Sequence, residues 1–221
     1  MWTELTAADG HRLAAWRTGP QDAPRGLVVV QEIFGVNRHM RGVCERFAAD
    51  GYAVICPALF DRTERGVELG YGPEDVARGR ELRGRIAAEA TLADIEAAAD
   101  ALGMCAKLGI VGYCWGGTVA WWGATRTRRF SAAVGWYGGG IAAAKDEAPH
   151  CPVQLHFGET DASIPLSDVE AIRAAQPDAE VFVYPGAGHG FGCEERASYV
   201  QADAELARSR TLQFLSVELS A

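Results

Sequence analysis

The sequence predicts an α/β fold with a mostly parallel β-sheet and helices on both faces. Short runs of apolar and β-branched residues recur along the chain, and segments with helical periodicity separate them. Continuous apolar runs are typical of strands buried on both faces, and strands that alternate with helices form parallel sheets. The predicted strands are Gly26–Gln31, Tyr52–Cys56, Leu108–Tyr113, Phe130–Tyr137, Val153–Gly158 and Glu180–Tyr184. At 221 residues, the chain is expected to form one domain over residues 1–221.

The remaining elements follow from turn and capping signals. Trp2–Leu5 and His11–Arg17 flank the turn sequence Ala-Ala-Asp-Gly, which predicts a hairpin at the start of the chain. Asn37 is a typical N-cap for a helix over His39–Ala49. Residues 58–72 resemble a loop. The other predicted helices run from Pro73 to about Ala88, over Thr91–Leu102 with Thr91 as cap, from Thr118 to Gly123 or beyond, over Leu166–Ala175 and over Ser198–Ser216.

Composition and charge exclude several classes of function. The formal net charge of −8 argues against a nucleic-acid partner. No stretch approaches the ~20 apolar residues of a membrane span, and the first residues lack the pattern of a signal peptide. The six cysteines form no C-x-x-C pair and are expected to be reduced thiols. We therefore expect a cytoplasmic protein, a monomer or a small homo-oligomer, whose partner is a small molecule.

The stretch Leu108–Gly117 carries the strongest functional signal. Gly112-Tyr113-Cys114-Trp115-Gly116 has the form G-x-C-x-G between a predicted strand and a predicted helix. This is the pattern of the nucleophile elbow of α/β-hydrolases, with Cys114 in place of the usual serine. A strained turn lifts the nucleophile off the sheet, and the positive end of the helix favours the thiolate. The structural alternative is a buried cysteine in a glycine-rich turn.

Two further residues follow predicted strands at the edge of the sheet where Cys114 lies. Asp161 follows the strand that ends at Gly158, and His189 follows the strand that ends at Tyr184. The chain order nucleophile, acid, base is the one expected of this fold. His189 can accept the thiol proton and return it to the leaving oxygen, and Asp161 can orient the imidazole.

The loop after Gly26–Gln31 is the third candidate at this edge. The backbone N–H of Trp115 and that of Ile33, or of Phe34 instead, would form an oxyanion hole. Glu32 follows a buried strand directly, so its carboxylate is expected to lie beside the thiol, although it could be an ordinary loop residue.

Each of the other candidates also has a structural interpretation. Asp161 could cap a helix, with Glu159 as the competing acid. Metal binding by His189 and Cys193 is unsupported because no second ligand pair accompanies them, so we expect no metal and no cofactor. The remaining candidates are expected to be structural: His156, Trp121 and Trp122 in the core, and His11, His39, His150 and the arginines of 78–85 on the surface.

The assembled motifs resemble the dienelactone hydrolase family, the carboxymethylenebutenolidases. They are Gln-Glu-Ile-Phe-Gly-Val-Asn at 31–37, Gly-Tyr-Cys-Trp-Gly-Gly at 112–117, Tyr-Gly-Gly-Gly at 137–140 and Gly-His-Gly-Phe at 188–191. The resemblance implies an α/β-hydrolase fold and a catalytic triad of Cys114, Asp161 and His189. It also implies that Glu32 pairs with the resting thiol and helps to activate it when substrate arrives. The family reaction is hydrolysis of an enol-lactone, dienelactone, to maleylacetate.

The sequence departs from this family where the family holds the substrate carboxylate with two arginines. One family arginine lies four residues after the catalytic histidine, where this chain has Cys193, and the nearest arginine downstream is Arg196. For the other, Arg78 or Arg80 could serve. Arg78 and Tyr137 are the substrate-binding candidates. The hydrolase chemistry is therefore expected to transfer better than the dienelactone substrate.

The predicted function is a cysteine-dependent hydrolase of carboxylic esters or lactones that forms a thioester acyl-enzyme. A general carboxylesterase or thioesterase with another acyl substrate is the first alternative. A glutamine-amidotransferase-like protein also places a cysteine on an elbow, but His189-Gly190-Phe191 lacks the His-x-Glu pair usual there. A non-catalytic binding module with the same fold is the last alternative.

Overall fold

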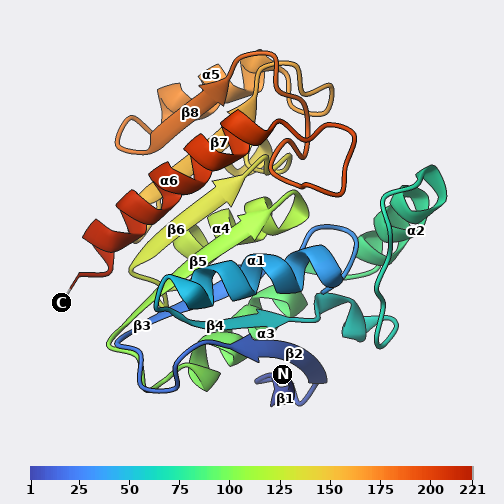
Figure 1. The fold of residues 1–221 in the computed structure, drawn as a ribbon, viewed down its shortest axis with the longest axis vertical. Coiled ribbons are helices and arrows are strands. Elements are labelled where there is room, and N and C mark those ends of the chain that lie inside the picture. The colour runs from blue at the N-terminus through green and yellow to red at the C-terminus, as the bar shows by residue number, and fades with distance from the viewer. Residues whose placement is uncertain (221) are drawn as a thin grey trace.

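The computed structural model describes residues 1–220 and contains one eight-stranded sheet within them. The strands lie in the order β1-β2-β4-β3-β5-β6-β7-β8 (Figure 1). The first two strands and the β2–β4 pair are antiparallel, and all later neighbours are parallel. The strands are β1 Trp2–Thr6, β2 Arg12–Thr18, β3 Arg25–Val30, β4 Ala53–Pro57, β5 Lys107–Tyr113, β6 Ala132–Trp136, β7 Val153–Gly158 and β8 Glu180–Tyr184.

Helices cover both faces of the sheet. Helices α1 and α6 lie on one face, and α3, α4 and α5 lie on the other (Figure 1). Helix α2 projects beyond the strand ends. The helices are α1 Arg38–Ala49, α2 Pro73–Gly84, α3 Ala88–Ala101, α4 Trp115–Arg126, α5 Leu166–Ala175 and α6 Gln201–Glu218, with short 3₁₀ helices at Leu59–Arg62 and Ala142–Ala144. Within residues 1–220, no helix is both long and apolar enough to cross a membrane.

The core lies between the sheet and these two helical layers. Every residue of β4, β6 and β7 is buried, as expected for continuous apolar runs that have helices on both sides. The predicted N-terminal hairpin and the six predicted core strands are confirmed. The Asn37 cap is also confirmed, because its side chain accepts a hydrogen bond from Met40 N. The α/β class predicted from the sequence is therefore confirmed.

Several local predictions differ from the structure, since Leu59–Arg62 of the predicted loop form a 3₁₀ helix and the last helix begins at Gln201 and not at Ser198. The predicted helix from Pro73 ends at Gly84 and not near Ala88. Thr91 is not a cap but lies inside α3, where its hydroxyl donates to the carbonyl of Ala87. A threonine hydroxyl can donate to a backbone carbonyl inside a helix, or it can accept from a backbone N–H at the start of a helix. The residue type alone therefore does not distinguish the two positions.

Candidate active site

Cys114 occupies a strained turn between β5 and α4. Its φ and ψ are 55° and −117°, a conformation that residues other than glycine rarely adopt. A side chain at Gly112 would overlap the carbonyl oxygen of Gly116, and one at Gly116 would overlap that of Val30. The two glycines of the G-x-C-x-G pattern therefore allow the turn to pack against the helix and the neighbouring strand.

The turn presents the thiol to residues from two other strand ends. Nε2 of His189 lies 3.2 Å from Sγ of Cys114, and Nδ1 of His189 lies 2.7 Å from Oδ2 of Asp161. Asp161 follows β7 and its other oxygen accepts a hydrogen bond from the backbone N–H of Ser163. The competing acid, Glu159, accepts from Gly186 N instead. The structure thus joins Cys114, His189 and Asp161 in one hydrogen-bonded chain.

The protonation of His189 is set by this chain. Burial lowers the pKa of His189, but the hydrogen bonds to Asp161 and Cys114 outweigh burial and raise the pKa to about 10. The imidazolium is therefore favoured at neutral pH. In that form both ring N–H groups donate, Nδ1–H to the carboxylate and Nε2–H to the sulfur. Such a pair stabilises a thiolate and holds a proton ready for a leaving group.

The backbone N–H groups expected to form an oxyanion hole belong to residues that border the thiol. Trp115 is the first residue of α4, so its N–H has no acceptor within the helix. Within residues 1–220, the N–H of Ile33 donates to no acceptor either. Both residues line the cavity that also contains Cys114 and His189. Phe34, the alternative to Ile33, lines the same cavity, so the lining does not decide which of the two N–H groups would contact an oxyanion.

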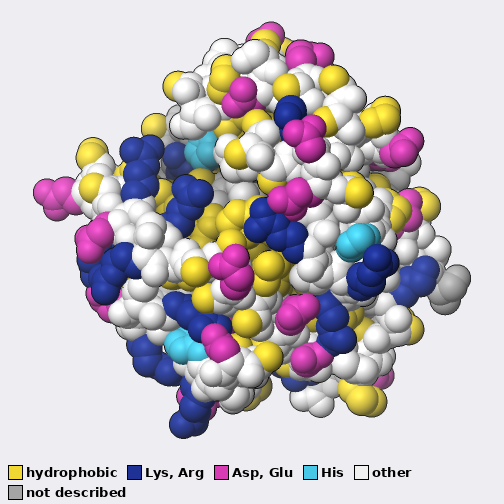
Figure 2. All heavy atoms as spheres, turned by 180° about the vertical axis from the view of Figure 1, so that it is seen from behind, with side chains coloured by type: hydrophobic (Ala, Val, Ile, Leu, Met, Phe, Trp, Pro, Cys, Tyr) yellow, Lys and Arg dark blue, Asp and Glu magenta, His cyan; other side chains and the backbone are white. Residues whose placement is uncertain are grey.

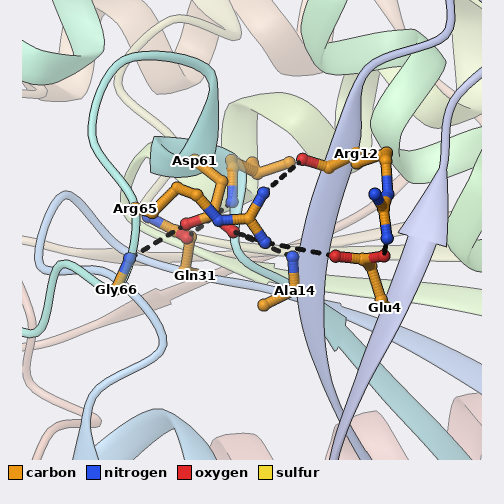
Figure 3. Close-up of polar contacts among 8 residues, drawn as sticks. Glu4, Arg12, Ala14, Gln31, Asp61, Arg65 and Gly66 are labelled. Atoms are coloured by element: carbon orange, nitrogen blue, oxygen red, sulfur yellow. Dashed lines mark hydrogen bonds and ion pairs between the residues drawn. The ribbon is translucent and has the colours of Figure 1, made fainter.

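The loop that carries Ile33 is anchored by Gln31. Its side-chain amide donates to the carbonyl of Glu32 over 3.1 Å, and its Oε1 accepts from Leu59 N over 3.0 Å. Figure 3 shows how the neighbouring segment is fixed in turn, because Asp61 accepts hydrogen bonds from the backbone of Ala14 and Gly66. These contacts pre-organise the loop before any ligand arrives.

A cavity of about 340 Å³ opens beside the thiol. In the view from behind, hydrophobic side chains lie in a hollow, and Lys and Arg side chains gather on the side where α2 projects (Figure 2). Arg80, Arg83 and Arg196 line the cavity. Within the described part of the chain, Arg80 and Arg83 form no ion pair. The cavity therefore combines apolar walls with unpaired positive charge.

Neither substrate-binding candidate chosen from the sequence lines this cavity. Arg78 pairs with Glu64 and Glu81 instead, whereas Arg80 and Arg83 of the same helix line the cavity. Tyr137 is fully buried, and its ring packs edge-on against His189 with 5.2 Å between ring centroids. Tyr137 thus packs against the imidazole and does not line the cavity.

Glu32 is fully buried near the site but does not touch the thiol. Its Oε1 lies 3.6 Å from Nη1 of Arg196, and neither carboxylate oxygen has a hydrogen-bond partner within residues 1–220. Burial raises the pKa of Glu32, and the charges of Arg196 and His189 offset part of that rise. The expected contact between Glu32 and the resting thiol is therefore absent, because Cys114 pairs with His189 and Glu32 pairs with Arg196.

Sequence reasoning missed the burial of His39 and the surroundings of Glu32. His39 was expected at the surface, yet it is 2% exposed. Tyr71 and Arg196 come from distant segments and close over this region, with the Arg196 guanidinium 6.0 Å from the Tyr71 ring centroid. The aromatic Tyr71 in a predicted loop was the available signal. The expectations for His156 and Trp121 are confirmed, since both are buried.

The sequence is similar to a known protein family and to named relatives over most of its length. Residues 13–219 match the model of the dienelactone hydrolase family. The chain is 37% identical over 212 residues to a Synechocystis sp. protein named "Putative carboxymethylenebutenolidase", an alignment covering 87% of this chain and 86% of that protein. It is 35% identical over 226 residues to a carboxymethylenebutenolidase of Pseudomonas putida, which covers 96% of this chain and 94% of the other.

Solved structures agree with the sequence comparison. A Klebsiella pneumoniae structure named "Putative Dienelactone Hydrolase" superposes with a TM-score of 0.83 at 33% identity, covering 98% of both chains. A Pyrococcus furiosus esterase reaches a TM-score of 0.73 at 16% identity over 100% of this chain and 93% of the other, which shows a shared fold. The predicted α/β-hydrolase fold is therefore confirmed.

Proposed function

Because the chain belongs to the dienelactone hydrolase family and is a hydrolase of ester bonds, we propose that it hydrolyses carboxylic esters and lactones with Cys114 as nucleophile. The hydrogen-bonded chain Asp161–His189–Cys114 at a strained elbow beside a cavity carries this proposal. An enol-lactone of the dienelactone type is the first substrate to test, and a simple carboxylic ester or thioester is the alternative.

The proposed reaction has two halves. Sγ of Cys114 attacks the acyl carbon, and the carbonyl oxygen takes negative charge where the N–H groups of Trp115 and Ile33 converge. Nε2–H of His189 protonates the leaving oxygen as the C–O bond breaks, which leaves a thioester. Water then attacks the thioester, His189 accepts a proton from that water, and Cys114 departs as thiolate. Asp161 holds the imidazole in the orientation that both halves require.

Two features of the site disfavour the other function classes. An amidotransferase-like protein usually has a glutamate two residues after the histidine, whereas here Phe191 is buried and packs against Tyr184. A binding module has no need of the strained conformation at Cys114, which destabilises a fold by about 1–3 kcal/mol. The hydrolase accounts for that strain, because the turn exposes the nucleophile.

The experiment that tests the proposal compares dienelactone with a p-nitrophenyl ester, each with and without prior iodoacetamide treatment. Turnover of dienelactone that alkylation abolishes would support the family reaction. Alkylation-sensitive turnover of the simple ester alone would support a related hydrolase with a different acyl pocket. Turnover that alkylation leaves unchanged, or no turnover of any ester, would contradict the cysteine mechanism.

We propose that the substrate carries a carboxylate that meets the arginines of the cavity. Replacing Arg80 with alanine is expected to raise KM about 5-fold for an ester with a second carboxylate, while KM for a neutral ester stays unchanged. One solvent-accessible charge pair contributes up to about 1 kcal/mol, which sets that size. The matched control is Arg78→Ala on the same helix, whose side chain faces Glu64 and Glu81. An equal effect of both variants would contradict this role.

We further propose that Glu32 serves the thiol chemistry at the expense of stability. Its folded-state pKa is raised, so folding favours the protonated acid, and stability is lost as pH rises through that pKa. Glu32→Gln is therefore expected to raise the unfolding free energy by about 1 kcal/mol at neutral pH and by less below pH 4.5.

Urea unfolding of the unaltered protein and of Glu32→Gln is measured at neutral pH and below pH 4.5. The rate of Cys114 alkylation by iodoacetamide is measured in both proteins as a function of pH. The alkylation profile is expected to shift in the variant, because a charge near His189 is lost. A variant that is less stable at neutral pH, with an unchanged alkylation profile, would show that Glu32 is a structural partner of Arg196 only.

We also propose that the chain is a single domain working in a reducing compartment such as the cytoplasm. All eight strands belong to one sheet, and the site residues follow the ends of β3, β5, β7 and β8 in that sheet. All six cysteines are unpaired. Free thiols on several elements are typical of proteins kept reduced.

A further inference from the structure

A second cluster of chemically reactive side chains lies behind the candidate active site. Glu32 follows β3, His39 is the second residue of α1, and Cys193 lies in the loop after β8. A carboxylate oxygen, an imidazole nitrogen and the thiol sulfur all lie within 4.8 Å of one another. The three side chains belong to residues that are 0%, 2% and 0% exposed.

The cluster is unusual because its carboxylate and its imidazole lack hydrogen bonds in the described part of the chain, although Arg196 forms an ion pair with Glu32 and Tyr71 lies against Cys193. Both carboxylate oxygens of Glu32 and both ring nitrogens of His39 lack hydrogen bonds within residues 1–220. Most buried polar atoms in proteins are hydrogen-bonded, so an unpaired set that converges on one point needs an explanation. A bound cation is such an explanation, because it would take one carboxylate oxygen, one ring nitrogen and the thiol sulfur at once.

The residue types of the cluster suit a metal ligand set. A carboxylate oxygen, an imidazole nitrogen and a thiol sulfur are all common ligands of transition-metal ions, and here all three belong to buried side chains. A soft metal ion deprotonates a coordinating thiol outright and releases its proton.

We propose that Glu32, His39 and Cys193 bind a thiophilic divalent cation, with Zn²⁺ as the first example, and that this ion inhibits the hydrolase. Sulfur, nitrogen and oxygen ligands together match Zn²⁺, whereas Ca²⁺ and Mg²⁺ prefer oxygen alone. Three protein ligands leave one position for water. The S–H bond of Cys193 breaks, an S–metal bond forms, and the proton goes to solvent.

Arg196 is the main competitor for this site. Its guanidinium is the ion partner of Glu32, and Arg46 and Glu194 also face His39. The Arg196 side chain is 20% exposed and lines the active-site cavity, so it can turn toward solvent when a cation takes Glu32. Gly192 and Glu194, on either side of Cys193, line a second cavity of about 150 Å³, so open space lies next to the cluster.

The inhibition follows from the role proposed above for Glu32, and this part of the inference rests on the proposed function. A cation on Glu32 removes its negative charge from the neighbourhood of His189. It also removes the ion partner of Arg196, which lines the substrate cavity. Metal binding itself is independent of catalysis and can be measured without any substrate.

The test must separate this cluster from Cys114 and His189, which also pair a thiol with an imidazole. Metal-free Cys114→Ser protein is titrated with Zn²⁺ by calorimetry and with Co²⁺ by absorption, where a thiolate ligand gives a charge-transfer band in the near ultraviolet. Saturable binding of one ion and the thiolate band are expected. Adding Cys193→Ala or His39→Gln to this protein is expected to weaken Zn²⁺ binding at least about 100-fold.

Cys151→Ala in the same background is the matched control and is expected to bind Zn²⁺ normally, since Cys151 lies outside the cluster. His39→Gln keeps the test valid if Cys193→Ala does not fold. Absence of saturable Zn²⁺ binding in folded Cys114→Ser protein would overturn the proposal. The Cys193→Ala substitution is also made in protein that keeps Cys114. A Co²⁺–thiolate band that persists in this protein but is absent from Cys114→Ser protein would instead assign the metal to the nucleophile.

The activity readout uses the protein with Cys114 intact. Zn²⁺ is expected to inhibit ester turnover, and Cys193→Ala is expected to keep near-normal turnover while losing that inhibition at least about 100-fold in Zn²⁺ concentration. Inhibition that is equal in both proteins would contradict the link to this site. If no ester is turned over, the proposed function fails, whereas the binding result still decides the metal site.

Discussion

Replacing Cys114 with alanine is expected to lower kcat for ester hydrolysis by at least about 10⁴-fold, because the acyl-enzyme can no longer form. The cavity and the N–H groups of Ile33 and Trp115 remain, so KM is expected to change little. The measurement is steady-state kinetics on an ester that the unaltered protein hydrolyses. Retained turnover in the variant would remove Cys114 from the mechanism.

The control for this prediction is the stability of the fold. Cys114→Gly is also expected to be inactive, but glycine adopts the φ of 55° without strain. The unfolding free energy of this variant is therefore expected to be higher than that of Cys114→Ala by about 1 kcal/mol. A glycine variant less stable than the alanine variant would show that the turn stores no strain. Kinetics and unfolding measurements on the two variants together separate lost catalysis from lost folding.

The elements that could be predicted from the sequence share a physical cause. The strand cores are continuous apolar runs, and the elbow needs glycines at 112 and 116 because neighbouring carbonyls fill the space of any side chain. These demands are local, so the residue types reveal them. Asp161 and His189 were placed at the correct edge because parallel strands end on the same side of a sheet.

Which arginine lines the cavity could not be predicted from the sequence, because it depends on the rotation of an exposed helix. Arg78, Arg80 and Arg83 all lie on α2, which buries only Gly79 and Leu82. With so narrow an apolar stripe, the periodicity does not say which arginine faces the cavity. The fold decides this when Gly79 packs against the backbone of Ile33, which turns Arg78 toward Glu64.

The cluster behind the nucleophile was invisible for a different reason. Cys193 lies more than 150 residues after Glu32 and His39, and the three residues lack the short Cys and His spacings that mark metal sites. His39 stands near the start of a helix whose cap was predicted correctly, yet its burial depends on Tyr71 and Arg196, which arrive from distant segments. Tertiary packing alone brings these groups together.

Asp161→Asn is expected to lower kcat by about 10²–10⁴-fold while leaving KM nearly unchanged, because the amide no longer stabilises the imidazolium of His189. The hydrogen bond to Asp161 is the leading cause that raises the pKa of His189 to about 10 against the effect of burial. In the variant, that pKa is expected to fall toward or below 6.5, which NMR titration of the imidazole can follow. An unchanged His189 titration would contradict the assignment of Asp161 as its partner.

The same substitution predicts a signed change in stability with pH. A histidine whose folded-state pKa is raised contributes stability that is complete below its unfolded pKa of 6.5 and is lost as pH rises to about 10. The difference in unfolding free energy between the unaltered protein and Asp161→Asn is therefore expected to be largest below pH 6.5 and to shrink up to about pH 10. Glu159→Gln is the matched control, because the Glu159 carboxylate accepts a hydrogen bond from the Gly186 backbone and has none to His189. A difference that grows with pH would mean that Asp161 holds a neutral imidazole, and catalysis would then begin from a thiol and a free base.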